Sequence, residues 1–405
     1  MSQRELEGVR VVEYGAWVNV AFGGKVMADL GATVVKVEPP DGDTPLRIHG
    51  AFPDDQPDLE TSAPHLYLNA NKRSVTLDPA SPAGRALFLK LAAWTDVLLD
   101  GTQAGELRSL DLDYPALHKA NPRLVMIALS SLGREGLYND CKGYDLTSWH
   151  ASGSSHLYQG EPGQAPLWGH WYNAAHWGGI NAAAAALTAL QARDRTGRGQ
   201  YVDISEAETI AALHLAVEVS DFMQNGTIRV RIGVNGPPTH APSTMRRCKD
   251  GWVYIAALAP HQWDNLIKVM GNPGWATSPL FKGNSRARAP YALEINELMT
   301  PWLESHTAQE LFEMCQANGV PAAPISDIRQ LYEQHHLRER GFFAEMDHPV
   351  AGRVSVPGPP FRISGDPWRI DRPAPLLGEH NAEVYCDILG LAAGDLPALR
   401  RAGVI

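Results

Sequence analysis

The segment HWYNAAHWGG, His170 to Gly179, concentrates side chains that can do chemistry in front of an alanine-rich segment. Histidine titrates near neutral pH and can act as a base or as a hydrogen-bonding group. His170, Asn173 and His176 are therefore candidate substrate-binding residues. Simpler roles stay open, because each histidine can pack beside a tryptophan and Asn173 can cap the following helix.

No carboxylate accompanies these residues. Between Pro162 and Arg193 the chain contains no aspartate or glutamate. A site built on this segment alone therefore lacks an acidic nucleophile, and any carboxylate would have to come from elsewhere in the fold.

Composition excludes several classes of protein. The 405 residues carry a formal net charge of −10, and no basic run long enough for a nucleic-acid surface occurs. The N-terminus lacks an apolar signal-peptide core, and no stretch is long and apolar enough to span a membrane. Four scattered cysteines without CxxC spacing, and no clustered histidines and carboxylates, favour free thiols without a metal site. We therefore expect a cytoplasmic protein.

The elements that position the segment alternate between strand and helix patterns. Short β-rich runs at 9–14, 33–38, 73–78, 96–100, 123–129 and 200–205 are separated by helical stretches. Nearly continuous apolar strands between helices predict a parallel sheet covered on both faces. The glycines of FGGKVMADLG do not form GxGxxG, so a dinucleotide site is poorly supported.

Two local signals mark helix ends. Ser81 and Pro82 are typical of an N-cap and first helical residue, and a helix over 181–193 is expected to stop at Gly197 and Gly199.

The pattern predicts an α/β fold: a large domain with a parallel sheet and a smaller inserted domain. We expect residues 1–215 to form the first part of the large domain, 225–325 the small domain, and 330–405 a segment returning to the large domain. The Pro- and Gly-rich tail from 340 is expected to wrap a surface, its own or a partner's.

Seven segments resemble the class III CoA-transferases, which include formyl-CoA transferase, carnitine CoA-transferase and α-methylacyl-CoA racemase. They are LGATVVKVEPPDGD (30–43), LNANKRSVTLD (68–78), NPRLVMIALSSLGREG (121–136), KGYDL (142–146), ALTALQARDRTGRGQYVDIS (186–205), NGVPAAPISD (318–327) and APLLGEHNAEV (374–384). The resemblance implies a Rossmann-like large domain, an interlocked dimer, and coenzyme A thioester as substrate with no permanently bound cofactor.

The family's nucleophile is an aspartate just before the alanine-rich helix. Alignment on the ALTALQARDRTGRGQ signature puts that position at Ala175, or at Ala174 with a one-residue shift. A carboxylate there would be held by free N–H groups at the helix start and would accept the acyl group. In this chain a methyl group stands at the position of the catalytic acid.

The resemblance also implies a CoA-binding set. Its members are Val18, Asn19, Leu68, Asn69, Asn71, Lys72, Arg73, Lys142, Gly143 and Tyr144. Alternatives remain for three of them: Lys142 can be a solvated lysine, Arg73 can pair with an acid of the fold, and Tyr144 can be a core residue with a bonded hydroxyl.

Other family positions depart from the pattern. Pro39 replaces a basic residue, Gly101–Thr102 replace an asparagine–aromatic pair, and GPPTHAP (236–242) replaces a glycine-rich lid. The racemase branch has histidine at the position of Tyr144, which disfavours racemase chemistry.

Three explanations for the missing acid remain. The chain is an inactivated Asp→Ala variant, a non-catalytic subunit paired with an active homologue, as in the succinyl-CoA:(R)-benzylsuccinate CoA-transferase type, or a CoA-ester binding or scaffold protein. The expected partners are an acyl-CoA such as succinyl-CoA, a carboxylic acid, and a second chain in a homodimer or heterodimer.

Overall fold

The computed structural model describes residues 4–15, 17–158, 160–231, 240–364 and 368–405. The chain forms two compact units, Met1–Arg231 with Gly341–Ile405, and Ile232–Arg340. The second unit is thus inserted in the sequence of the first, with boundaries later than the expected 225 and 325. Segment 236–242, which replaces the glycine-rich lid of the family, lies partly outside the described residues.

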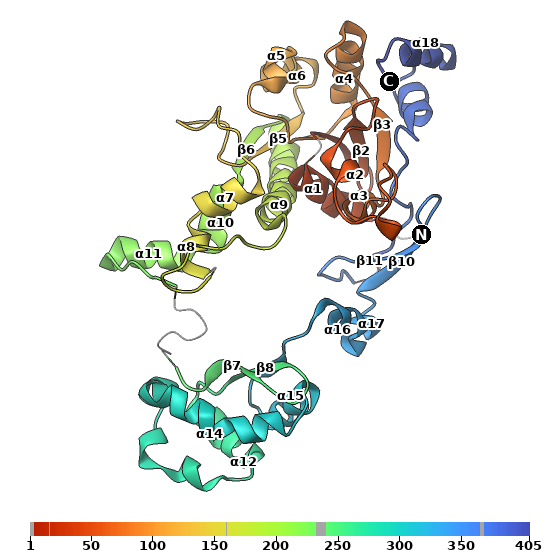
Figure 1. Cartoon of the computed structure of the whole chain (residues 1–405). Coiled ribbons are helices and arrows are strands. Elements are labelled where there is room, and N and C mark those ends of the chain that lie inside the picture. The colour runs from red at the N-terminus through yellow and green to blue at the C-terminus, as the bar shows by residue number, and fades with distance from the viewer. Residues whose placement is uncertain (1–3, 16, 159, 232–239, 365–367) are drawn as a thin grey trace. The chain divides into compact units, whose positions relative to one another are not determined.

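A six-stranded parallel sheet forms the centre of the large unit, in the order β3-β2-β1-β4-β5-β6 (Figure 1). The strands are β1 (Arg10–Tyr14), β2 (Thr33–Glu38), β3 (Arg73–Thr76), β4 (Val97–Asp100), β5 (Val125–Ser130) and β6 (Tyr201–Ser205). All six expected strands are confirmed, and their order is that of a Rossmann sheet. The strands run parallel, and the order in which the chain adds them to the sheet reverses between β1 and β4.

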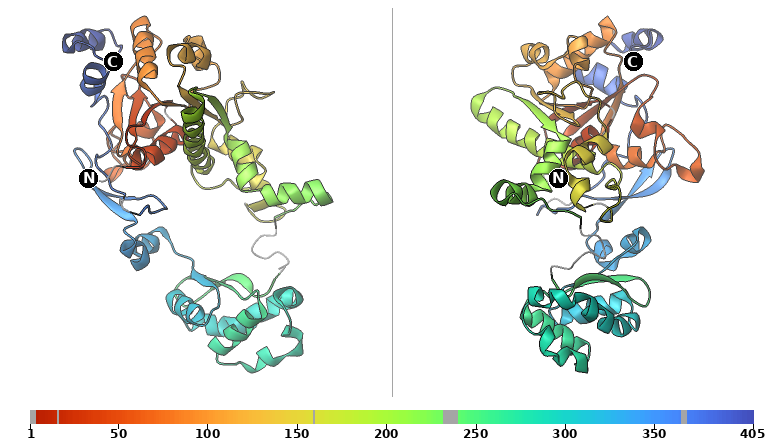
Figure 2. Two further views of the ribbon diagram at one scale, coloured as in Figure 1. Left: turned by 180° about the vertical axis from the view of Figure 1, so that it is seen from behind. Right: turned by 60° about the vertical axis from the view of Figure 1, so that its left-hand side comes forward.

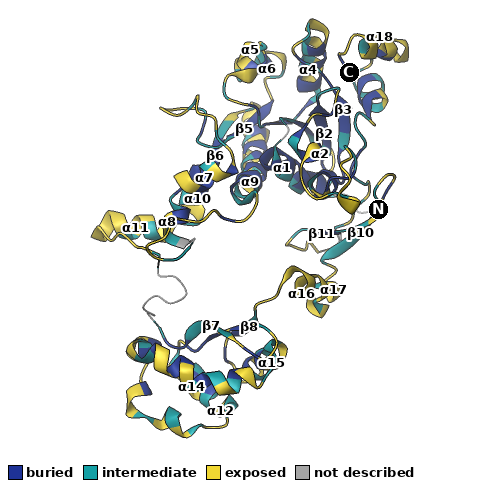
Figure 3. Ribbon diagram, viewed as in Figure 1, coloured by how far each residue is buried: buried dark blue, intermediate teal, exposed yellow. Residues whose placement is uncertain are grey.

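Helices cover both faces of the sheet. The helices of this unit are α1 (Val18–Asp29), α2 (Pro45–Ile48), α3 (Ala63–Asn69), α4 (Pro82–Trp94), α5 (Glu106–Ser109), α6 (Tyr114–Ala120), α7 (Asp145–Ala151), α8 (Ser154–Tyr158), α9 (Asn173–Thr196), α10 (Glu206–Leu213), α11 (Ala216–Asn225) and α18 (Leu396–Arg401), and not all of them lie against the sheet. Neighbouring strand residues point to opposite faces, so Val11 packs with α1 and α9 while Val12 packs with α4 and α6. Figure 3 shows this sheet as buried, which explains why its strands are apolar throughout.

Local signals at two helix ends were mostly read correctly. The Ser81 hydroxyl accepts the N–H of Gly84 at 3.0 Å, and Pro82 is the first residue of α4. Gly197 ends α9 in the left-handed conformation, with φ 72°. Gly199 was expected to share this role. Glycine is required there for a different reason, because a Cβ would lie 1.9 Å from the Leu124 carbonyl oxygen and would clash with it.

Helix α9 starts at Asn173 and not at the expected Asn181, so most of the opening segment, residues 173–179, is helical. It crosses α1 through two glycines, where a Cβ on Gly179 would lie 2.6 Å from the Asn19 carbonyl oxygen and one on Gly23 would lie 3.1 Å from the Gly179 carbonyl oxygen. Gly23, the first glycine of FGGKVMADLG, therefore serves close helix packing.

The C-terminal segment protects the open edge of the sheet at β3. After the hairpin β10 (Phe343–His348) and β11 (Gly352–Pro357), the chain runs beside β3, as both Figures 1 and 2 show. The N–H of Thr76 donates to Asn381 Oδ1 at 2.9 Å, and the Tyr385 hydroxyl donates to the Thr76 carbonyl at 2.7 Å. A π-helix spans Glu383–Ile388. The tail therefore wraps the chain's own surface and occupies groups that an edge strand would expose.

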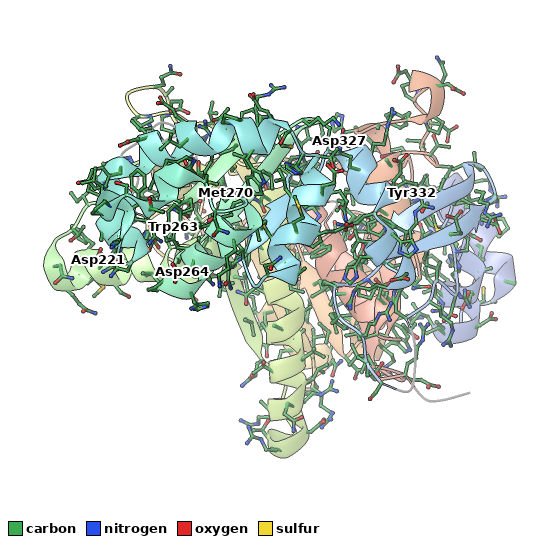
Figure 4. The ribbon with its side chains drawn as sticks, turned by 90° about the horizontal axis from the view of Figure 1, so that it is seen from below. Asp221, Trp263, Asp264, Met270, Asp327 and Tyr332 are labelled. Carbon is green, nitrogen blue, oxygen red and sulfur yellow. The ribbon has the colours of Figure 1, made fainter. Side chains whose placement is uncertain are left out.

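The small unit has its own core. Its elements are β7 (Ser243–Arg247), β8 (Trp252–Ala256), β9 (Ala322–Pro324), α12 (Pro260–Val269), α13 (Ser285–Arg288), α14 (Ala292–Glu304), α15 (Ala308–Ala317), α16 (Ile328–Glu333) and α17 (His335–Glu339). Trp263 on α12, labelled in Figure 4, is buried in this core, and the Arg288 guanidinium lies 4.5 Å from its ring centre.

Within the described ranges, no helix combines the length and hydrophobicity that crossing a bilayer requires.

Candidate functional site

A cavity of about 770 Å³ opens at the carboxyl ends of the central strands. Tyr14 at the end of β1, Gly101 after β4 and Ser130 at the end of β5 line it. Gly15 allows the loops after β1 and β4 to meet, since a Cβ there would lie 2.7 Å from the Gly101 carbonyl carbon. In open α/β sheets, ligands bind at this point of strand-order reversal. The cavity is therefore the candidate ligand site.

Its lining is acidic. Five of the lining residues that the structure describes are carboxylates and none is Lys, Arg or His: Asp41, Asp43, Asp78, Glu106 and Glu206. Burial and nearby carboxylates raise the pKa of the Tyr14 phenol, as expected in a negative potential. The cation for a phosphate must therefore come from outside this lining. Lys142 is exposed between the lining residues Cys141 and Gly143, where a point charge could reach an anion.

Three residues of the expected CoA-binding set line this cavity: Asn19, Gly143 and Tyr144. Tyr144 is 57% exposed, so its alternative role as a core residue is wrong. Val18, by contrast, is buried beside Ala175 and does not reach the cavity lining.

Glu206 was missed from the sequence. It is the first residue of α10, is 1% exposed, and still lines the cavity. Asn19 Nδ2 donates to its Oε1 at 2.7 Å, and the Ser148 hydroxyl donates to its Oε2 at 2.6 Å. Burial raises the pKa of Glu206 despite these hydrogen bonds. Its place directly after β6 is the signal that could have found it, because the carboxyl ends of parallel strands meet at one edge.

The start of α9 also receives a carboxylate, although not its own. Asp145 Oδ1 accepts the N–H of Ala175 at 2.8 Å, and Trp168 Nε1 donates to Oδ2 at 3.3 Å. Burial raises the pKa of the Asp145 carboxyl, and these hydrogen bonds oppose the increase. Asn173 is not the cap that was one alternative: Tyr172 is at the cap position, and α9 has no side-chain cap of its own there. Asp145 lies in the KGYDL segment, but its role was not foreseen.

Ala175 is fully buried in an apolar cluster. Its methyl group packs with Val18, Ala21, Leu46 and Leu68. The position therefore offers neither an acid nor open space to a thioester in this structure.

Several residues of segment 68–73 are used in packing and hydrogen bonds within the protein. Lys72 is fully buried, and its Nζ donates to Glu13 Oε2 and the Ala21 carbonyl, each at 2.7 Å, and to Asn69 Oδ1 at 3.1 Å. Burial lowers the pKa of Lys72 to about 8. Leu68 and Asn69 are also buried, and neither lines the large cavity. These contacts do not favour a CoA-binding role for the three residues.

Asn71 and Arg73 instead form hydrogen bonds with the C-terminal segment. Asn71 Oδ1 accepts the N–H groups of Asp371 at 2.8 Å and Arg372 at 3.2 Å. Arg73 Nε donates to Glu383 Oε1 at 2.7 Å, so its alternative role, pairing with an acid of the fold, is confirmed.

A second cavity, of about 360 Å³, lies beside α1 and α9. Asn173 and His176 line it, whereas His170 is exposed and does not. His176 Nδ1 lies 2.6 Å from the Tyr172 carbonyl, and its ring makes an edge contact with Phe22 at 4.7 Å. Burial lowers the pKa of His176, which favours the neutral ring. The structure thus brings two of the three candidate substrate-binding residues together.

Comparison with known proteins finds similar sequences and similar structures. The family model described as CoA-transferase family III matches residues 6–381. Succinyl-CoA–D-citramalate CoA-transferase of Chloroflexus aurantiacus is 34% identical, over 99% of this chain and 98% of its own length. The BbsE subunit of succinyl-CoA:(R)-benzylsuccinate CoA-transferase of Thauera aromatica is 31% identical, over 95% and 94%. A CAIB/BAIF family protein from Brucella suis has a similar structure, with TM-score 0.84, 28% identity, and coverage of 95% of this chain and all of that one.

Proposed function

Because the chain belongs to CoA-transferase family III, we propose that it works in an assembly that moves CoA from an acyl-CoA such as succinyl-CoA to a carboxylic acid, without itself supplying the nucleophile at position 175. A subunit role in a two-chain enzyme, like that of the BbsE relative, explains this best.

One observation carries the proposal. Ala175 has no acid, its methyl group is fully buried, and its N–H is already bound by Asp145. A mixed anhydride with the enzyme needs a carboxylate oxygen that can reach the thioester carbon. Position 175 provides no such oxygen, so the acyl-accepting aspartate would come from a homologous chain.

The large cavity is the proposed CoA site of this chain. Asn19, Gly143 and Tyr144 would contact the pantetheine arm, and Lys142 would supply a positive charge to phosphate. The acidic lining argues for weak binding, because several carboxylates repel the phosphates of CoA.

We also propose that the chain works as a dimer. The family resemblance implies an interlocked pair, here with a homologous chain or with a second copy. An inactivated Asp→Ala variant remains the second candidate, because the surrounding sequence, NAAHWGG, keeps the family's pattern around the lost acid. A scaffold that binds CoA esters would differ from both by being isolated alone. Racemase chemistry has the least support, since Tyr144 replaces the branch's histidine.

The test is turnover by the pure chain. Succinyl-CoA and (R)-benzylsuccinate or another carboxylic acid are incubated with the purified protein, and exchange of CoA esters is followed by chromatography. We expect no turnover above background from this chain alone, and activity when a homologue with the aspartate is added. Turnover by the pure chain at ordinary enzyme rates, with kcat of about 1 s⁻¹ or more, would refute the subunit role. A native mass spectrum from the source organism would show whether one or two kinds of chain are present.

A further inference from the structure

Glu206 has a fixed place in the wall of the large cavity. Its side chain is 1% exposed, yet the residue lines the cavity that is proposed for CoA. Helix α9 packs directly against it, since a Cβ on Gly178 would lie 2.9 Å from Glu206 Cγ. The carboxyl group therefore keeps its neighbours, and its hydrogen bonds show which protonation states it can adopt.

The contact with Asn19 shows which carboxyl oxygen is an acceptor. Asn19 Oδ1 accepts the N–H of Val20 at 2.7 Å, so the amide nitrogen Nδ2 faces Glu206 and donates to Oε1 at 2.7 Å. An amide nitrogen has donors and no acceptor. Oε1 is therefore an acceptor in either protonation state, and a proton on this carboxyl group is carried by Oε2.

The Ser148 hydroxyl contacts Oε2 and a backbone carbonyl at the same time. Ser148 Oγ lies 2.6 Å from Glu206 Oε2 and 3.3 Å from the Tyr144 carbonyl oxygen. A hydroxyl has one proton to donate, and a carbonyl oxygen can only accept. Both contacts are hydrogen bonds together only when Oε2 carries a proton and donates it to Ser148, which then donates to Tyr144.

The ionised form uses the same contacts differently. Ser148 then donates to Oε2, and the Tyr144 carbonyl keeps only the backbone N–H of Ser148, at 3.1 Å. Rotation of one hydroxyl thus converts the site between the two protonation states of Glu206.

The surroundings favour the neutral form. Burial raises the pKa of Glu206, and the Asp145 carboxylate on α7 raises it further. The residues that α1 and α9 place against the carboxyl group, Asn19 and Gly178, carry no charge. The described lining of the cavity adds four more carboxylates and no cation.

Other titratable groups on the neighbouring elements have partners of their own or face solvent. Asp203 on β6 accepts the N–H of Arg134, His150 on α7 bonds to Ser155, His176 on α9 bonds to the Tyr172 carbonyl, and Glu208 on α10 is exposed. Asp145 is therefore the charged group that faces Glu206.

We propose that Glu206 is a binding residue of the CoA cavity that acts as the neutral acid, so that binding of CoA takes up a proton from solvent at Oε2. An ionised Glu206 would add a negative charge to a cavity that receives the phosphates of CoA, whereas the neutral acid adds none. The neutral form also connects Oε2 through Ser148 to the backbone of Tyr144, which lines the cavity. The inference rests on the proposed CoA site and adds the proton on which binding there depends.

The test is calorimetric titration of the pure chain with CoA between pH 5 and 8, with Glu206→Gln beside the parent. The glutamine amide copies the neutral acid, because it accepts from Asn19 and donates to Ser148. We expect equal affinities at pH 5 and, at pH 8, binding at least about threefold weaker in the parent than in the variant, because only the parent gains a charge. Titration of the phosphates of CoA affects both proteins alike and cancels in this comparison.

Proton uptake is a second measurement on the same samples. In buffers of different ionisation enthalpy near pH 7, the parent should take up more protons per CoA bound than Glu206→Gln does. Equal proton uptake by the two proteins would contradict the inference.

Two further variants test the assignment to Glu206. Glu208→Gln, at an exposed residue of the same helix, should keep the pH profile of the parent. Asp145→Asn removes the charge that raises the pKa of Glu206, so the loss of CoA affinity should begin at a lower pH. This variant decides the question if Glu206→Gln does not fold.

The outcomes separate this inference from the proposed function. Identical pH profiles of the parent and Glu206→Gln overturn the inference and leave the CoA site in place. Absence of CoA binding at every pH overturns the CoA site and the inference with it.

Discussion

The carboxylate of Asp145 accepts the backbone N–H of Ala175 at 2.8 Å, so the start of α9 keeps an acid although the family's acid is missing from the helix itself. The N–H groups at a helix start are unpaired within the helix and favour negative charge. Asp145, 4% exposed, meets this demand from α7. A second carboxyl, Glu206, is near enough for the Asp145 charge to raise its pKa further beyond the effect of burial.

Restoring the acid at position 175 is the first prediction. Ala175→Asp puts a carboxylate into an apolar cluster beside Asp145, and we expect the free energy of unfolding to fall by about 1–3 kcal/mol, without recovery of CoA exchange. Urea denaturation and the exchange assay measure the two effects. Ala184→Asp, at an exposed position on the same helix, is the control and should cost much less. Recovered activity would instead identify the chain as an inactivated variant.

Glu206 should make stability depend on pH. Burial raises the pKa of Glu206 in the folded state, so the folded protein binds this proton more tightly than the unfolded chain does. The resulting contribution to stability is complete below the ordinary carboxyl pKa and is lost as pH rises through the raised value. Glu206→Gln keeps the shape without the charge and should gain stability relative to the parent as pH increases from 4 to 8. Denaturation midpoints across this range check the trend, with the exposed Glu208→Gln as the control. A constant difference between variant and parent would contradict the assignment.

Lys72 is predicted to be structural. Lys72→Met leaves the buried Glu13 carboxylate with the Lys36 ammonium at 3.7 Å as a more distant ionic partner, and should lower the free energy of unfolding by about 3–5 kcal/mol. Arg73→Met breaks a partly exposed pair with Glu383 and should cost about 1 kcal/mol or less. Chemical denaturation of both variants tests this. Parent-like stability of Lys72→Met with weakened CoA binding would restore its predicted ligand role.

The crossing of α1 and α9 should not tolerate a side chain at Gly179. A methyl group there meets the Asn19 carbonyl oxygen at 2.6 Å and Phe22 Cβ at 3.0 Å, so Gly179→Ala should destabilise by about 1–3 kcal/mol despite better helix propensity. Gly394→Ala, where nothing lies within 4 Å of the added Cβ, serves as the comparison in thermal or urea unfolding. Equal stability of both variants would show that the helices separate without cost.

Much of this molecule was determined by local sequence. The strands at Val11, Val34 and Val97 were readable because a sheet buried on both faces needs apolar runs, and Ser81, Pro82 and Gly197 carry the backbone preferences of helix ends. The family was readable because seven segments keep their order, and with it the absence of an acid at Ala175.

Tertiary structure decided what the polar residues do. Lys72 and Arg73 are adjacent in a matched motif, yet one is buried against Glu13 and the other pairs with Glu383, more than 300 positions away. Asp145 and Glu206 became site residues only because α7 and the end of β6 meet the start of α9, and Lys25 and Trp177 share a cavity only because α1 crosses α9 at two glycines. Burial and partners depend on residues distant in the chain, and these set the charge, pKa and availability of each group, which no local pattern encodes.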